Sequence, residues 1–144
     1  MIGSIQAQIK ALKIRLKELQ KRLRELEEAY ESLCLFSGSV DRARGDFNDV
    51  NGQKKCALAS LDPVLMRSES AAEYREGMGE TLDGVGTKIV GAAFVGLSGL
   101  VQVRKLGYEA EITWHKAEIK LVQKTIRELE EMLAVLMAAE ELLG

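Results

Sequence analysis

Residues with reactive side chains are few in this sequence and stand apart from one another. His115 is the single histidine, and no serine or cysteine lies in a setting that suggests a rigid pocket around it. One histidine cannot hold a metal alone, and at a heptad position a polar residue more often sets helix register. We therefore expect no catalytic site, no metal and no cofactor.

The remaining candidates for chemistry are also weak. The run Gly84-Val85-Gly86 lacks the third glycine of a phosphate-binding loop and follows no strand. Cys34 and Cys56 lie on one expected helix, where a rise of about 1.5 Å per residue separates them by roughly 33 Å. They cannot form a disulfide with each other while that helix is intact.

Charge and composition exclude further classes. The chain has 144 residues, a net charge of -2, and is 47% apolar, 29% charged and 5% aromatic. This charge gives no bulk attraction to nucleic acid, and the basic run at 10–24 is typical of a solvated helix face. The few aromatic residues predict a thin aliphatic core with no deep ligand pocket.

A heptad pattern in the N-terminal arm organises the chain. Apolar residues recur at alternating steps of four and three, which predicts a helix packed against another helix. Lys, Arg, Glu and Gln occupy most other positions of this arm. The pattern consists of Ile5, Ile9, Leu12, Leu16, Leu19, Leu23, Leu26, Tyr30 and Leu33.

The C-terminal arm repeats the pattern over the same length. Residues 10–24 carry seven basic side chains against Glu18, whereas eight glutamates follow position 108. Opposite charges favour pairing of the two arms within one chain, antiparallel, with Leu19 near Val122. The second pattern consists of Tyr108, Ile112, His115, Ile119, Val122, Ile126, Leu129, Leu133 and Leu136.

These arms predict an all-α fold, an elongated antiparallel helical hairpin or coiled coil with a Gly-rich helical middle segment. We expect one domain over 1–144, with a long helix at 4–60, a Gly-rich helical segment at 63–107 and a closing helix at 108–142 that follows Gly107. Asp62-Pro63 and the capping-box spacing of Ser70 and Glu73 predict a turn at about 60–70.

Beyond Leu33, apolar residues of the first helix occur at positions directly beside the heptad pattern. We interpret this as a rotation of the packed face near Leu33, toward a different partner surface. These apolar residues are Phe36, Ala43, Val50 and Ala57. Between 77 and 107 eight glycines mix with apolar residues, so this segment either packs on 36–60 or docks partly on another protein.

A docking site for a partner helix is expected where these two features meet. The arms satisfy each other at equal length, so surplus apolar surface remains in the middle of the chain, rimmed by Arg42, Arg44, Lys88 and Arg104. The predicted partner-binding residues are Phe36, Phe47, Val50, Ile89, Phe94, Leu97 and Leu100.

The expected location is the cytoplasm. The N-terminus shows no basic and apolar regions of a secretory signal peptide. Residues 89–103 are uncharged, but they are interrupted by glycines and shorter than the roughly 20 residues that span a bilayer. We therefore expect no membrane span.

The order of elements resembles the small YwqH-like coiled-coil proteins of Gram-positive bacteria. A heptad helix is followed by Phe36-Ser-Gly-Ser-Val40 and Phe47-Asn-Asp-Val50, then by Ala72-Glu-Tyr74 and Gly77-Met78, a Gly-rich stretch and a closing heptad helix. The resemblance implies a helical protein encoded next to an LXG-type toxin. Such a protein binds the toxin's N-terminal helices and presents the toxin to the type VII secretion machinery.

The sequence departs from the helical-hairpin substrates of that pathway. It has no Trp-x-Gly turn unless Phe36-Ser37-Gly38 replaces it. It also has no Tyr-x-x-x-Asp/Glu export signal, because its three tyrosines are each followed four positions later by Cys34, Met78 or Ile112. Export of the chain together with its partner is therefore left open.

The function predicted from the sequence is that of a non-enzymatic helical binding partner or targeting chaperone of a secreted LXG-type toxin. A second small helical protein is a further expected partner. The alternative is a self-associating coiled coil, such as a homodimeric scaffold or a phage assembly protein. A membrane-active helical protein is a third class, which depends only on residues 89–103.

Overall fold

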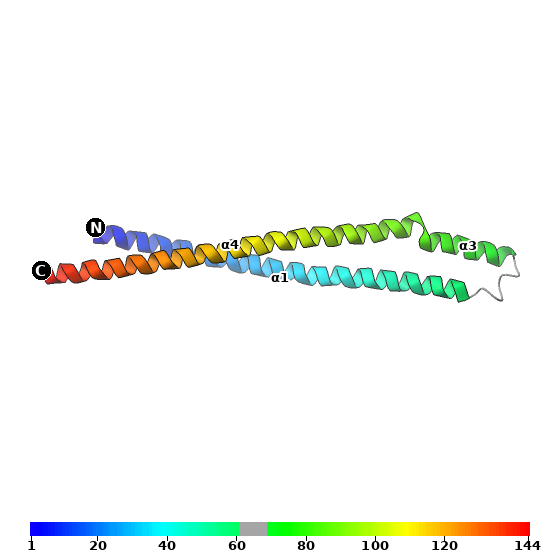
Figure 1. Cartoon of the computed structure of the whole chain (residues 1–144), viewed down its shortest axis with the longest axis horizontal. Helices are drawn as coiled ribbons and strands as arrows, with labels where there is room; N and C mark the ends of the chain where they lie inside the picture. The colour runs from blue at the N-terminus through cyan, green and yellow to red at the C-terminus, as the bar shows by residue number, and fades with distance from the viewer. Residues whose placement is uncertain (61–68) are drawn as a thin grey trace. The chain divides into compact units, whose positions relative to one another are not determined.

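The computed structural model describes residues 1–60 and 69–144, and these residues form three helices (Figure 1). Helix α1 spans Ile2–Ser60, α3 spans Glu69–Asp83 and α4 spans Val85–Leu143, with no strand in the described parts of the chain. The prediction of an all-α helical hairpin is confirmed. The turn expected at 60–70, with its caps at Asp62 and Pro63, falls largely on residues outside this description.

The described chain divides into two compact units, where the sequence suggested one domain over 1–144. Unit 1 combines Met1–Ser32 with Lys105–Gly144, and unit 2 consists of Leu33–Arg104. Each unit therefore contains part of α1 and part of α4, and unit 2 also contains α3.

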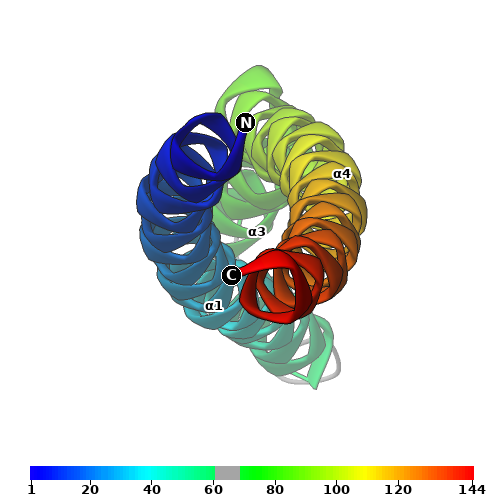
Figure 2. The same ribbon diagram turned by 90° about the vertical axis from the view of Figure 1, so that its left-hand side faces the viewer.

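Unit 1 is held together by the two heptad patterns. Figures 1 and 2 show the N-terminal part of α1 beside the C-terminal part of α4, with the two termini at the same end of the unit. All eighteen predicted positions are buried or half-buried, and Leu26 is the most deeply buried, at 2% exposed. We call the packed positions the seam. Its central cluster contains Ile5, Ile9, Val122 and Ile126, and Leu12, Leu16, Leu19, Leu129, Leu133 and Leu136 pack against it.

Ion pairs across the seam establish the direction of the two arms. Lys13 Nζ lies 3.1 Å from Glu130 Oε1, and Lys116 Nζ lies 3.9 Å from Glu27 Oε1. Moving forward along α1 from Lys13 to Glu27 thus moves backward along α4 from Glu130 to Lys116, so the arms are antiparallel. These side chains are about half exposed, so each pair contributes less than about 1 kcal/mol and selects register more than it adds stability.

Unit 2 keeps the same seam on α1, which corrects the expectation that the packed face rotates near Leu33. Val40 is buried, Phe47 and Leu58 are half-buried, and Phe36 and Val50 beside them are each 48% exposed. Ser37 and Asn51, at seam positions that have lost large apolar residues, are half-buried because they are small enough to fit between two helices, whereas Arg44 at the seam position between them is exposed. The apolar residues beside the seam are therefore exposed rather than packed.

Side-chain contacts between described residues join α1 to the second half of unit 2. The rings of Phe47 and Phe94 pack with centroids 5.9 Å apart. Asn51 Nδ2 donates a hydrogen bond of 3.4 Å to the carbonyl oxygen of Leu82. Lys55 forms an ion pair with Asp83.

Helix α4 continues through Gly107, so the expectation that the closing helix begins there is wrong. A glycine inside a helix costs up to about 1 kcal/mol relative to Ala, which is less than packed neighbours on both sides supply. Buried Val101 and half-buried Tyr108 are such neighbours. The helical structure is interrupted instead at Gly84, between α3 and α4, where the Thr87 hydroxyl donates a hydrogen bond of 3.1 Å to the Thr81 carbonyl oxygen.

Candidate partner-binding surface

The seven predicted partner-binding residues do not form one patch. Phe47 and Phe94 pack on each other inside unit 2, so these two belong to the chain's own interior. The other five lie on the surface, with Leu97 37% and Leu100 70% exposed. The role of these residues in partner binding stays a prediction, and the exposed five divide between two faces.

The first face is an apolar flank on one side of the unit 2 seam. On α1 its residues directly precede the seam positions Ser37 and Asn51 and the corresponding Arg44, and on α4 they directly precede Gly91 and Ser98. Residues at equivalent heptad positions of an antiparallel pair meet on the same side of the seam. We call this face the apolar flank; it consists of Phe36, Ala43, Val50, Val90 and Leu97.

Unit 1 confirms that these heptad positions face each other. Arg15 and Glu118 directly precede the seam residues Leu16 and Ile119, and their side chains form an ion pair. In unit 1 this side of the seam is therefore charged, whereas in unit 2 it is apolar.

The opposite side of the unit 2 seam is more polar. On α1 it carries Asp41, Asn48 and Lys55, and on α4 it carries Lys88 and Gln102 beside Val95. An apolar surface on only one side of a helix pair is the arrangement that a third helix can cover.

The second face is the outer surface of α4 in unit 2, which holds Ile89 and Leu100 at 62% and 70% exposed. Sequence reasoning missed Val103, which lies on this face and is 69% exposed. Its spacing of three from Leu100 was the available signal. The expected break at Gly107 hid that signal, because it placed Val103 at the end of a segment.

Helix α4 carries enough apolar surface to be noted as a candidate membrane span. Within Ala72–Leu143 the described residues include an 18-residue window of mean hydropathy 1.5, which by length and composition alone could cross a membrane. Only 6% of that window is buried in the chain. Most residues of that window are therefore exposed or half-buried in the described chain.

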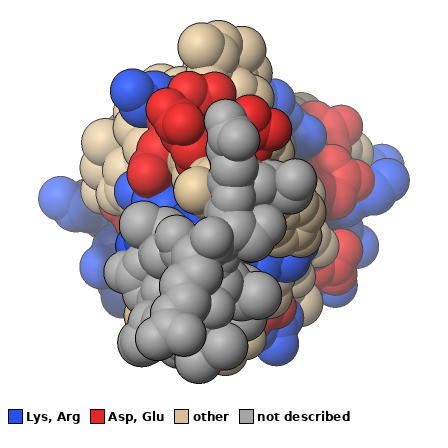
Figure 3. Space-filling view, turned by 90° about the vertical axis from the view of Figure 1, so that its right-hand side faces the viewer, with Lys and Arg blue, Asp and Glu red and all other residues tan. Residues whose placement is uncertain are grey.

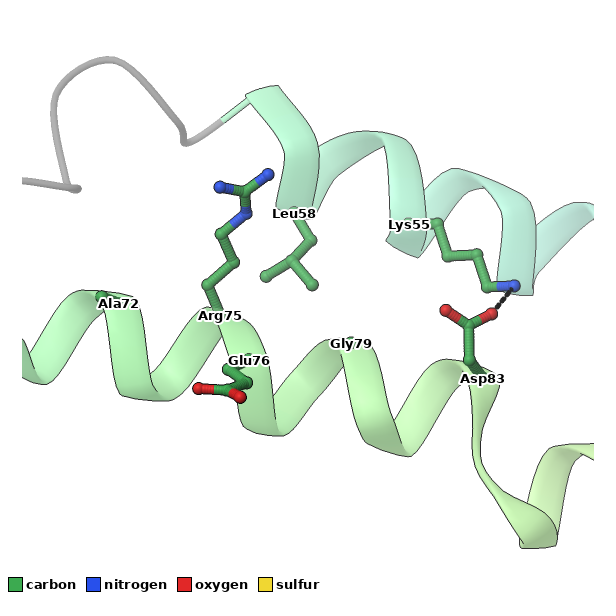
Figure 4. A pocket seen from close by; sticks show the side chains of 7 residues that line it. All are labelled: Lys55, Leu58, Ala72, Arg75, Glu76, Gly79 and Asp83. Carbon is green, nitrogen blue, oxygen red and sulfur yellow. Dashed lines mark ion pairs between the residues drawn. The ribbon is translucent and has the colours of Figure 1, made fainter.

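A pocket of about 510 Å³ lies in unit 2 between α1 and α3 (Figure 4). Arg75 of α3 extends toward Leu58 of α1, and Glu76 points away from α1. The Lys55–Asp83 ion pair lies at the other side of the pocket. The lining groups include charges of both signs, and Ala72 and Gly79 complete the α3 side of the lining.

Charges of both signs also surround the end of unit 2 that carries α3. On the face seen in Figure 3, acidic and basic side chains are interspersed around the residues drawn in grey. The described residues on this face therefore carry no excess of one sign that would favour a strongly charged ligand.

His115 holds a seam position, as expected. Its Nδ1 lies 2.9 Å from the carbonyl oxygen of Glu111, which can only accept, so Nδ1–H is the donor. The Trp114 ring meets the His115 ring edge to face, with centroids 5.0 Å apart. Cys34 and Cys56 are free thiols, and no cluster of three potential metal ligands occurs among residues 1–60 and 69–144.

No family model, curated protein or solved structure matches the chain. The function of the chain is therefore inferred from the surfaces described above.

Proposed function

We propose that this chain is a non-enzymatic helical binding partner of another protein, and that the apolar flank of unit 2 is where the partner docks. The observation that supports this is the one-sided exposure of large apolar residues from two helices. Phe36 and Val50 on α1 are 48% exposed, and Val90 and Leu97 on α4 are 39% and 37% exposed. An amphipathic helix lying along the flank would cover all four.

The resemblance to YwqH-like proteins supports a particular partner. An LXG-type toxin offers N-terminal helices of the required kind, so we propose that the chain is the toxin's targeting chaperone in type VII secretion. It would bind the toxin in the cytoplasm, with a second small helical protein as a further member of the complex.

The apolar flank can be tested with a pair of matched substitutions on α4. We expect Val90→Asp to weaken binding of the N-terminal helical domain of the adjacent toxin at least about tenfold, because the carboxylate would be buried without a partner. Val95→Asp introduces the same charge on the other side of the seam, at a residue 54% exposed. It should leave the affinity within about twofold, since rim changes contribute little.

Isothermal titration calorimetry gives both affinities, and circular dichroism verifies that each variant keeps its helicity. Equal weakening by the two substitutions would show that the flank has no special role. Normal binding by Val90→Asp would place the docking site elsewhere on the chain.

The alternative function is a self-associating structural scaffold or phage assembly protein. The outer face of α4 favours this alternative, because its exposed apolar residues are not part of the flank. A stable dimer of the purified chain that shows no affinity for the toxin domain would support the scaffold over the chaperone.

A further inference from the structure

The outer face of α4 in unit 2 carries an apolar stripe that is exposed over its whole length. Its members recur at steps of four and three, the spacing of a helix-packing seam, but they lie away from the seam of unit 2. Ile89, Leu100 and Val103 are 62%, 70% and 69% exposed. We call these residues stripe A: Ile89, Ala93, Gly96, Leu100 and Val103, all exposed.

The outer face of α4 in unit 1 carries a second stripe with the same spacing. Trp114 and Leu121 are 61% and 63% exposed, although both are residue types that are usually covered. We call these residues stripe B: Gly107, Ala110, Trp114, Ala117 and Leu121, all exposed.

The two stripes are complementary in size when they run antiparallel. The residue spacings of stripe A, read toward the C-terminus, equal those of stripe B, read toward the N-terminus. Each residue of stripe A therefore lies opposite one residue of stripe B. Trp114, the only aromatic residue of the two stripes, then faces Gly96, and Leu100 faces Ala110. Complementary sizes of this kind allow two helices to approach closely. The full set of pairs is Ile89 with Leu121, Ala93 with Ala117, Gly96 with Trp114, Leu100 with Ala110, and Val103 with Gly107.

Space at the glycines agrees with this pairing. A Cβ atom added to Gly96 or Gly107 would meet no atom within 4 Å. No described residue of the chain therefore requires glycine at either position, and each glycine costs helix stability relative to Ala. A close approach by the helix of another molecule would explain why glycine occupies both positions.

We propose that the partner on this surface is a second copy of the chain, with stripe A of each copy packed antiparallel on stripe B of the other. Because α4 contains both stripes, two copies satisfy each other and form a closed two-fold dimer. This proposal does not rest on the proposed function, because the apolar flank that would bind the toxin uses other residues.

Charge and area also favour a second copy. In this register Arg104 of one copy comes next to Glu111 of the other, as Lys13 and Glu130 do across the seam of unit 1. Each copy contributes five large apolar side chains that are more than three-fifths exposed. Ten such side chains, with their neighbours, approach the roughly 1,200 Å² of total area at which stable interfaces begin.

The test uses the full-length chain and measures its mass by sedimentation equilibrium. We expect the wild-type chain to be a dimer at tens of micromolar, and Trp114→Ala to weaken dimerisation about 30-fold or more. Gly96→Leu should also produce a monomer, because the new side chain occupies the space of Trp114, while the helical content of the monomer is unchanged or higher. Gly45→Leu is the control, since Gly45 lies on α1 and likewise has no atom within 4 Å of an added Cβ.

The pairing itself is tested by combining the two changes. The double variant Gly96→Leu with Trp114→Ala should recover dimerisation relative to Gly96→Leu, because the large and small residues have exchanged places. A wild-type chain that is monomeric, or that binds neutral phosphatidylcholine vesicles as a monomer, would overturn the proposal. So would a Gly96→Leu variant that dimerises as tightly as the Gly45→Leu control.

Discussion

Replacing Leu26 by Ala tests whether the seam of unit 1 carries the stability of the chain. Leu26 is 2% exposed, so the substitution removes side-chain atoms that are almost wholly shielded from water and leaves a cavity between two helices. Leu→Ala changes at such sites cost about 2–5 kcal/mol. We expect about 3 kcal/mol here, because a seam only two helices thick can collapse partly around the cavity.

The expected loss is large beside the total. A domain is stable by about 5–15 kcal/mol, and 3 kcal/mol lowers the melting temperature of a chain of this size by about 10 °C. Thermal unfolding followed by far-ultraviolet circular dichroism measures the shift. Leu35→Ala is the matched control, because Leu35 lies on the same helix and is 70% exposed.

The control should lower the melting temperature by no more than about 2 °C, since little apolar area returns to water. If the two variants melted together, the seam would not be packed as the structure shows. A lower melting temperature for Leu35→Ala alone would mean that the helix packs its opposite face against the other arm.

Three further predictions concern register, the helix break and the interior of unit 2. Cysteines replacing Leu19 and Val122 in a background without other cysteines should crosslink within one chain, seen as a shifted monomer band on non-reducing electrophoresis; crosslinks only between chains would refute the hairpin. Gly84→Ala should destabilise the chain by about 1–3 kcal/mol in denaturant titration, because the new Cβ would clash with the backbone carbonyl oxygen of Glu80, whereas Gly86→Ala should stabilise it by up to about 1 kcal/mol. Phe94→Asp should unfold unit 2, observed as faster amide exchange there, and a folded variant would mean that this ring is not interior.

The seam of unit 1 could be predicted because its periodicity is unbroken. Ile5 to Leu33 and Tyr108 to Leu136 keep the four-and-three spacing without exception, so the face of each helix that meets the other arm could be identified. The antiparallel direction followed from the charge of the two arms and is confirmed by pairs such as Lys13 with Glu130.

The seam of unit 2 was harder to predict, because side-chain size and heptad position disagree there. Position favours Ser37 and Asn51 as packed residues, whereas size favours Phe36 and Val50, and the structure follows position. Once two helices are aligned over one stretch, continuing in the same frame avoids twisting either of them.

The internal contact between Phe47 and Phe94 was also predictable in principle. Phe94 lies two heptads before Tyr108, but the expected break at Gly107 stopped the frame from being extended backward. The break at Gly84 had no comparable signal, since seven other glycines between 77 and 107 are equally plausible.

The hydrophobic cluster that contains Ile5, Ile9, Val122 and Ile126 joins the two arms, which are synthesised at different times. The ribosome adds about 5–20 residues per second, so after residue 33 has been added the first residue of the second arm follows about 4–15 s later. During that time the N-terminal apolar stripe has no partner in its own chain and is exposed to chaperones, nascent neighbours or a ready-made helical protein. The seam of unit 1 can thus form only after the second arm has been synthesised, and the vulnerability of the chain to aggregation should rise with the rate at which many copies are translated together.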